Sequence, residues 1–283
     1  INLNTTSYKW DVITKIGDYT VTVYYSGDKN YTPVTMTKSF TVTSYNATDL
    51  QKAIDDAIKN NQSELNLTQD YIFGDDQKIP VIINASIKIN GNDHTIDANG
   101  TDGVFNITSD DVSLNDLKIN NAKDAAINAD RDNLNISNVN ISDSAKGIVI
   151  DGNNPTIKDT TISRGSDKAI DIKGNDANMD DVNILDNTGD AITVDGKGGE
   201  LSHIIIANTT GKGIVIDGND TLIKDSIIAY CSEDPLGING DNATLINATI
   251  IGCNGTAVGI NGSDAKVSDL KIQGAVTAIL KDA

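Results

Sequence analysis

Aromatic residues make up only 4% of this 283-residue chain, and the 22 lysines and arginines are outnumbered by 40 aspartates and glutamates. The resulting formal net charge of -18 repels phosphate backbones, so we exclude nucleic acid as a partner. No apolar run approaches the ~20 residues of a membrane-spanning helix, so we expect no membrane span in this fragment. The scarcity of aromatic rings also leaves few platforms on which sugars could stack.

Isoleucine, by contrast, recurs at a fixed interval over most of the chain. Eight isoleucines follow one another every 22 residues, with one step of 21: Ile119, Ile141, Ile162, Ile184, Ile206, Ile228, Ile250 and Ile272. Such a period is typical of a stacked solenoid, in which each repeat buries its apolar side chains against its neighbours. Because the apolar runs are short and rich in Ile, Val, Thr and Asn, we predict an all-β fold in which strands of successive coils pair in parallel.

Two polar columns mark the corners of the predicted coils. One is a glycine column, for which we expect a left-handed backbone: Gly152, Gly174, Gly196, Gly218, Gly240 and Gly262. The other is an Asp/Asn column that His203 interrupts once: Asp116, Asn138, Asp159, Asp181, Asp225, Asn247 and Asp269. We interpret its members as bend residues whose side chains bond local backbone, because stacking alone would place neighbouring carboxylates at the coil spacing.

The first 81 residues follow different patterns. Alternation in residues 19–25 and 39–43, around a turn signal, predicts antiparallel strands. Thr48 and Gln51 form a capping-box pattern ahead of apolar residues at helical spacing, which predicts a helix with Thr48 as N-cap. We interpret this helix as a lid over the first coil. The expected domains are therefore residues 1–45, a capping helix and first strand in 46–81, and a solenoid in 82–283 that is truncated at its C-terminus.

Several segments carry a resemblance to known families. GIVIDGNNPTIKDTTIS and GIVIDGNDTLIKDSIIA resemble repeats of the right-handed parallel β-helix of pectate lyases, viral tailspikes and surface adhesins. Residues 17–42 resemble the closing strands of an immunoglobulin-like β-sandwich. Together with the lid helix, these features resemble the adhesin-like cell-surface proteins of methanogenic archaea. The resemblance implies a right-handed parallel β-helix with ~22-residue coils and an N-terminal capping helix, preceded by the end of an immunoglobulin-like domain.

No catalytic residue, metal or cofactor is predicted. The enzymes that the chain resembles in architecture use arginine and lysine on the outward face of one strand stack. The equivalent positions here include no basic residue: Asn106, Asn128, Val149, Asp171, Thr193, Val215, Gly237 and Gly259. His94 and His203 have no Cys, His or paired carboxylate at metal-ligand spacing, so we interpret them as surface or bend residues. We therefore expect that the protein is not an enzyme.

Three weaker site predictions come from single positions. Ile205, Ile227 and Ile246 are expected to point outward, which makes them a candidate contact surface. Cys231 and Cys253 should stack in adjacent coils, either as a disulfide or as two buried thiols. Asn-x-Ser/Thr sequons exceed the number expected from composition, which favours N-glycosylation and export, although the repeat itself could generate many of them. The candidate sites include Asn106, Asn140, Asn208, Asn242, Asn247, Asn254 and Asn261.

The function predicted from the sequence is that of an extracellular, cell-surface, adhesin-like rod that displays or adheres without catalysis. Its partner would be a surface protein or glycan of another cell. Two alternatives stay open: a carbohydrate-active β-helix enzyme, either a polysaccharide lyase or a glycoside hydrolase, and a viral receptor-binding spike.

Overall fold

The computed structural model describes residues 17–42, 44–74 and 80–281, and its contacts divide the chain into Ile1–Ser44 and Tyr45–Ala283. In the first unit, β1 (Gly17–Tyr25) and β2 (Val34–Val42) pair antiparallel, and the rings of Tyr19 and Phe40 stack with centroids 5.8 Å apart. The predicted antiparallel strands are thus present as a hairpin. An immunoglobulin-like sandwich is not confirmed, because the described part of this unit contains these two strands alone.

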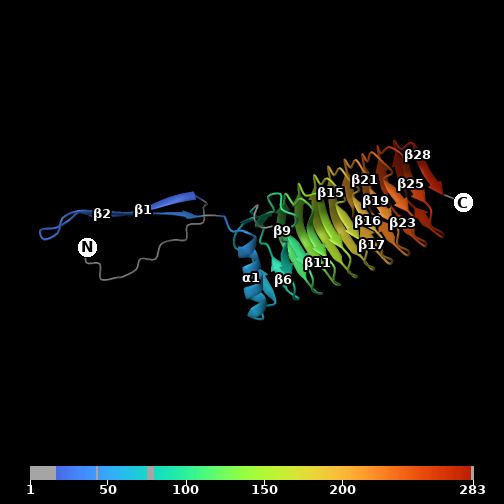
Figure 1. The fold of residues 1–283 in the computed structure, drawn as a ribbon. Coiled ribbons are helices and arrows are strands. Elements are labelled where there is room, and N and C mark those ends of the chain that lie inside the picture. Colours follow the sequence, from blue (N-terminus) through green and yellow to red (C-terminus); the bar gives the residue numbers. More distant parts are fainter. Residues whose placement is uncertain (1–16, 43, 75–79, 282–283) are drawn as a thin grey trace. The chain divides into compact units, whose positions relative to one another are not determined.

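The second unit is a parallel β-solenoid, in which coil stacks upon coil with one strand of each coil in a common sheet (Figure 1). Residues one coil apart are direct partners, as in Ile148↔Ile170 and Ile170↔Ile192. The predicted period and parallel pairing are therefore confirmed. This ten-stranded sheet contains β5 (Val81–Ile83), β8 (Phe105–Ile107), β10 (Ala125–Ala129), β12 (Lys146–Ile150), β14 (Ile170–Ile172), β16 (Ile192–Val194), β19 (Ile214–Ile216), β22 (Leu236–Ile238), β25 (Thr256–Ile260) and β28 (Thr277–Lys281).

A sixteen-stranded sheet forms the other walls of the coils. Four of its strands are eight residues long and continue through the Asp/Asn bend, whereas in later coils the bend separates two short strands. One path along it contains β3 (Glu64–Asn66), β6 (Lys88–Asn90), β9 (Ser113–Asn120), β11 (Asn135–Ser142), β13 (Thr156–Ser163), β15 (Asn178–Leu185), β17 (Glu200–Ser202), β20 (Leu222–Lys224), β23 (Thr244–Ile246) and β26 (Lys266–Ser268). Beside it lie β4 (Tyr71–Ile72), β7 (Thr95–Asp97), β18 (Ile205–Ala207), β21 (Ile227–Ala229), β24 (Thr249–Ile251) and β27 (Lys271–Gln273).

The interior of the coils is a continuous aliphatic core. Seven of the eight periodic isoleucines are at most 2% exposed, and Ile272 in the last coil packs partly buried against the same core. Burying an isoleucine side chain contributes about 1.5–3 kcal/mol, so these ladders supply much of the cohesion between coils. A functional site must therefore be built from the outward residues of the strands and from the bends and corners between them.

The bend column is confirmed, but its side chains bond a different partner from the one expected. All eight residues of the column, His203 included, have a left-handed backbone with φ between 49° and 53°. Asn138 Nδ2 donates to Asp116 Oδ1 at 2.7 Å, and Asn247 Nδ2 donates to Asp225 Oδ1 at 2.7 Å. These side chains therefore link successive coils, because stacking places consecutive members of the column within hydrogen-bond distance of each other.

The corner glycines are required by the close approach of neighbouring coils. A Cβ atom on Gly218 would lie 1.8 Å from the carbonyl oxygen of Gly196, and the other glycines of the column meet the preceding coil at 1.7–2.0 Å. Their backbone is not left-handed, so the sequence-based expectation is wrong on this point. Left-handed backbone occurs two residues later instead, at Asn154, Asp176, Asp220, Asn242 and Asp264.

A single helix in the described residues, α1 (Ala47–Lys59), packs against β3, β4 and β5 of the first coil. Its N-cap is Asn46 and not Thr48 as predicted, because Asn46 accepts from the backbone of Thr48 and Asp49 while the Asp49 carboxylate returns a bond to the Asn46 N–H. Gln51 Oε1 accepts from Ile82 N at 2.7 Å, and Gln51 Nε2 donates to Ile82 O at 3.0 Å. The helix therefore satisfies polar groups on the outer edge of β5. The described residues include no helix able to cross a bilayer.

Candidate active site

A hollow of about 290 Å³ opens on the outward face of the ten-stranded sheet, over β8, β10 and β12. This volume is close to the lower limit of about 300 Å³ for ordinary ligand pockets. Its lining combines carboxylates, amides and one ammonium group with a small apolar floor: Pro80, Asp102, Gly103, Phe105, Asn106, Asp124, Ala125, Asn128, Lys146 and Val149. Such a lining offers several donors and acceptors to a hydroxyl-rich ligand.

Lys146 connects the hollow to a charged residue in the next coil. Its ammonium lies 3.0 Å from Asp124 Oδ1 and 4.0 Å from Asp167 Oδ2. The pKa of Lys146 is raised, chiefly by the hydrogen bond to Asp124. Val149, which also lines the hollow, is the direct partner of Asp171 on β14. The hollow and the surface around Asp171 therefore form one continuous stretch of the same sheet.

Three carboxylates gather on this stretch, which we call the acidic cluster: Asp171, Asp195 and Asp217. Asp171 faces outward from β14, and Asp195 and Asp217 immediately follow β16 and β19, whose residues pair in register. Since neighbouring strands lie about 4.8 Å apart and residues i and i+2 about 6.6 Å apart, Asp195 is next to Asp217 and about 8 Å diagonally from Asp171 between α-carbons.

Each flanking carboxylate of the cluster is held by a polar partner. Lys168 Nζ lies 3.1 Å from Asp171 Oδ1, and Asn239 Nδ2 donates to Asp217 Oδ1 at 2.6 Å. Lys173, in the row of Asp195, is paired with Asp151 at 2.8 Å. Asp195 therefore has two negatively charged neighbours, Asp171 and Asp217, while the lysine in its own row, Lys173, is already paired with Asp151.

The pKa of Asp195 is raised above its ordinary value. Desolvation is the largest cause, followed by the negative charges of Asp217 and Asp171, while Lys168 and Lys173 oppose the shift. Thr193, two residues before Asp195 on the same face, is only 6% exposed, whereas Asp195 itself is exposed at the surface of the coil. A carboxyl group with a raised pKa beside ionised carboxylates is the pattern of a general acid with its partner base.

The sequence argument missed this site because it considered one residue per coil. It found no basic residue at the outward centre of each strand, yet Lys146 and Lys168 reach the same face from three positions earlier in their coils. Asp195 and Asp217 were likewise missed because they come just after the strands. The signal in the sequence was the second outward column, at positions 151, 173, 195, 217, 239 and 261, which reads Asp, Lys, Asp, Asp, Asn and Asn.

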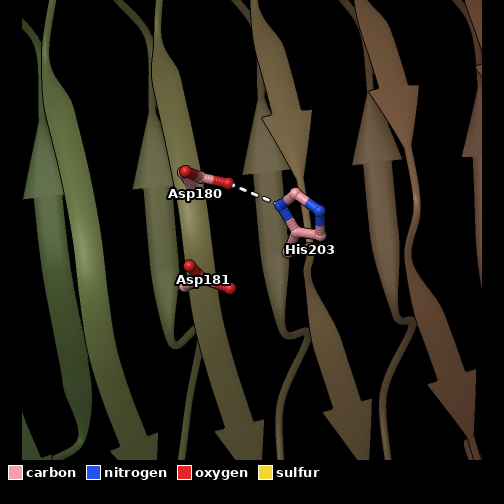
Figure 2. Close-up of side chains that lie close together, drawn as sticks. All are labelled: Asp180, Asp181 and His203. Carbon is pink, nitrogen blue, oxygen red and sulfur yellow. Dashed lines mark hydrogen bonds and ion pairs between the residues drawn. The ribbon is translucent and has the colours of Figure 1, made fainter.

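A second cluster lies on the sixteen-stranded sheet, where Asp180 and Asp181 of β15 approach His203 between β17 and β18 (Figure 2). His203 Nδ1 lies 2.8 Å from Asp180 Oδ1, and this hydrogen bond is the main cause of the raised pKa of His203 and the lowered pKa of Asp180. Spacing along the sequence hid this arrangement, because the carboxylates come from the preceding coil.

The remaining predicted site residues are placed on the surface or between coils. Ile205, Ile227 and Ile246 point outward with exposures of 42%, 42% and 38%, and Ile205 and Ile227 are partners on β18 and β21. Their use as a contact surface stays a prediction. The same holds for the sequons, of which Asn208, Asn242, Asn247 and Asn261 already donate their amides to the preceding coil. Asn140 and Asn254 are exposed, and Asn106 is half-buried beside the hollow.

Cys231 and Cys253 occur as two buried free thiols in adjacent coils. The backbone N–H of Cys231 donates to Cys253 Sγ at 3.2 Å, and the contact between the thiols together with burial raises the pKa of Cys231. Their stacking matches the geometric basis of the prediction, while oxidation to a disulfide stays a prediction.

Comparison with known proteins identifies the fold. A family model described as the right handed beta helix region matches residues 79–203 and 190–280. The C387A mutant of DFA-IIIase from Arthrobacter chlorophenolicus A6 is similar at 12% identity with a TM-score of 0.52, over 72% of this chain and 57% of that one. The same enzyme in complex with GF2 has 13% sequence identity and a TM-score of 0.51, and the match covers 76% of this chain and 64% of that one. Endopolygalacturonase I from Stereum purpureum has 16% sequence identity and a TM-score of 0.49. The match covers 77% of this chain and 87% of that one.

These findings correct the function predicted from the sequence. The solved structures that resemble the chain are β-helix enzymes, which contradicts the prediction of a non-catalytic adhesin-like rod and the expectation that the protein is not an enzyme. The sequence argument had weighed neither the acidic cluster nor its neighbouring lysines when it excluded catalysis. Nothing in the comparisons supports an archaeal adhesin or immunoglobulin-like modules.

The likeness to the two DFA-IIIase structures, at 12–13% identity, shows the fold, and the chain spans about 57–64% of the length of those chains. No curated protein matches the chain in sequence. The family model, however, covers well over half of the chain and agrees with the parallel coils of the structure. The chain therefore belongs to the right-handed beta helix family.

Proposed function

We propose that the protein is a carbohydrate-active enzyme, specifically a glycoside hydrolase whose substrate lies along the outward face of the ten-stranded sheet. The observation that carries this proposal is the acidic cluster, in which Asp195 has a raised pKa next to carboxylates of successive coils. The hollow beside it supplies a binding site for a neighbouring sugar unit. The solved β-helix enzymes with TM-scores above 0.5, both DFA-IIIase, are compatible with chemistry on this fold and do not specify the reaction.

In the proposed mechanism Asp195 is the general acid and Asp171 the general base. Protonated Asp195 gives its proton to the glycosidic oxygen as the bond to the anomeric carbon breaks, and ionised Asp171 takes a proton from the attacking water. Lys168, whose Nζ lies 3.1 Å from Asp171 Oδ1, holds the carboxylate of the base in position. The α-carbons of the two residues are about 8 Å apart, so their side chains can set the roughly 6.5–9.5 Å between carboxyl groups with which inverting hydrolases accommodate that water.

The charge of the face indicates a neutral glycan. Asp102, Asp124 and the acidic cluster outnumber Lys146 and Lys168, and the whole chain carries a net charge of -18. A polyuronate would be repelled from this surface, whereas neutral hydroxyls can accept from Lys146 and donate to the carboxylates. This reasoning favours hydrolysis of neutral chains over lyase chemistry on acidic ones.

Two further expectations stand as proposals. An extracellular location would give such an enzyme access to polymeric glycans, and the partner would then be a glycan and not a protein receptor. Helix α1 would act as the cap of the solenoid, as its bonds to Ile82 and its buried Leu50 and Ile54 support.

The test of the proposed function is a screen of the purified chain against neutral and uronate polysaccharides. Reducing ends and oligosaccharides should appear from at least one neutral glycan, and not through the unsaturated products of a lyase. Absence of product from every neutral glycan across pH 3–9, with the fold verified by circular dichroism, would overturn the proposal.

The pH dependence of kcat/KM should report Asp195. Because a general acid must be protonated, activity should decline as pH rises through the pKa of Asp195, which lies above the ordinary 3.8. Asp217→Asn removes a negative neighbour and should move this descending limb to lower pH. Lys173→Gln removes an opposing positive charge and should move it to higher pH. Shifts of the same sign in both variants would contradict the assignment.

A further inference from the structure

Asp180, Asp181 and His203 present three metal-binding side chains to a common point. One ligand atom from each residue lies within 4.8 Å of the others, and among the described residues this is the one such group of three or more (Figure 2). His203 Nδ1 and Asp180 Oδ1 are hydrogen-bonded at 2.8 Å, so the two ligand atoms already face each other and need to separate only slightly to hold an ion at about 2.0–2.2 Å from each. All three side chains are accessible or half-buried, so an ion could enter from solvent.

Stacking holds these ligands in place. Asp180 pairs in register with Ser202, which puts Asp181 opposite His203 in the bend column. Ser202 is only 5% exposed, and its Oγ lies 2.7 Å from Asp180 Oδ1, so it orients the carboxylate from behind. In established metal sites, ligand side chains are oriented in the same way, by a hydrogen bond to a further residue that does not itself bind the metal.

The other histidine offers an internal comparison. His94 Nδ1 also bonds a carboxylate, Asp70 Oδ1, at 3.0 Å. No second carboxylate completes a group of three around it within the described residues. The two histidines therefore share the same ion-pair geometry and differ in the additional ligand, Asp181.

We propose that Asp180, Asp181 and His203 bind a divalent first-row transition-metal ion such as Zn²⁺. Calcium and magnesium prefer oxygen ligands alone, whereas an imidazole with two carboxylates suits zinc and its neighbours. Three protein ligands leave room for water to complete the coordination shell. On binding, the ion takes the place of the proton between His203 Nδ1 and Asp180: a charged imidazole releases that proton to solvent, and a neutral imidazole carries its single proton on Nε2 instead. The ion then links two successive coils on a sheet separate from the acidic cluster.

The experiment is a calorimetric titration of tag-free chain with ZnCl₂, with CaCl₂ in parallel. Zinc should bind with saturation near one ion per chain, and His203→Asn should weaken binding about tenfold or more. Asn is compatible with this backbone, since Asn138 and Asn247 occupy the same column with φ of 52° and 50°. Asp181→Asn serves as a second ligand variant. Asp269→Asn, in the same column three coils away, is the matched control and should bind zinc like the parent chain.

A spectroscopic readout distinguishes this site from general attraction to an acidic surface. The chain has two histidines, so imidazole ¹H–¹⁵N signals can be assigned by His203→Asn. Substoichiometric zinc should shift the His203 signals and leave those of His94 in place. The proposal is overturned by non-saturating zinc binding, by equal affinity in both ligand variants and the parent chain, or by equal shifts of the two histidines.

Discussion

Replacing Asp195 by asparagine should lower kcat/KM on the glycan found by screening by about 10²–10⁴-fold, the usual contribution of a general acid. The amide keeps the shape of the carboxyl group and cannot give up a proton to the leaving oxygen. The loss should fall mainly on kcat, because an interaction required only in the transition state is removed. Initial rates measured at several substrate concentrations separate kcat from KM.

Asp264→Asn is the matched control for this experiment. Asp264 is an exposed corner residue with φ of 55°, and Asn242 occupies the equivalent position one coil earlier with φ of 57°. The control variant should keep parental kcat and KM. If Asp195→Asn retains activity within a factor of about three, well below the contribution of a general acid, then Asp195 does not have the assigned role.

Replacing Gly218 by alanine should lower stability more than any surface substitution. The new Cβ atom would lie 1.8 Å from the carbonyl oxygen of Gly196 and 2.4 Å from its carbonyl carbon, and neither is the end of a flexible side chain. The coils must separate locally, and overpacking of this kind costs about 1–3 kcal/mol or more. Because each coil is stabilised by its neighbours alone, the loss should weaken stacking on both sides of the corner.

Gly237→Ala provides the comparison in the adjacent coil, because a Cβ atom at Gly237 has no atom within 4 Å. This variant should be neutral or gain up to about 1 kcal/mol through reduced freedom of the unfolded chain. Thermal unfolding followed by circular dichroism should show a Tm lowered by roughly 4–10 °C for Gly218→Ala alone. Similar Tm values for both variants would show that the coils adjust to the added methyl group.

The architecture could be predicted from the sequence because a solenoid encodes its fold in a one-dimensional period. Ile148, Ile170 and Ile192 are 22 residues apart, and they stack as partners because each coil has the same length and buries the same position. The bends were predictable for a similar reason, since Asp and Asn tolerate a left-handed backbone. Cap selection at α1 was less certain, because Asn46–Asp49 and Thr48–Gln51 both satisfy the pattern.

The period by itself determined which residues face inward and which columns recur on the surface. Only the tertiary structure decided which surface residues contact each other. A contact between coils depends on the length and direction of each side chain and on which neighbouring side chains leave it room. Lys146 reaches Asp124 from the next coil, and Asp180 reaches His203 across the same kind of boundary. The sequence also did not show why each corner residue is glycine, because the carbonyl oxygen that leaves no room for a Cβ atom belongs to the preceding coil.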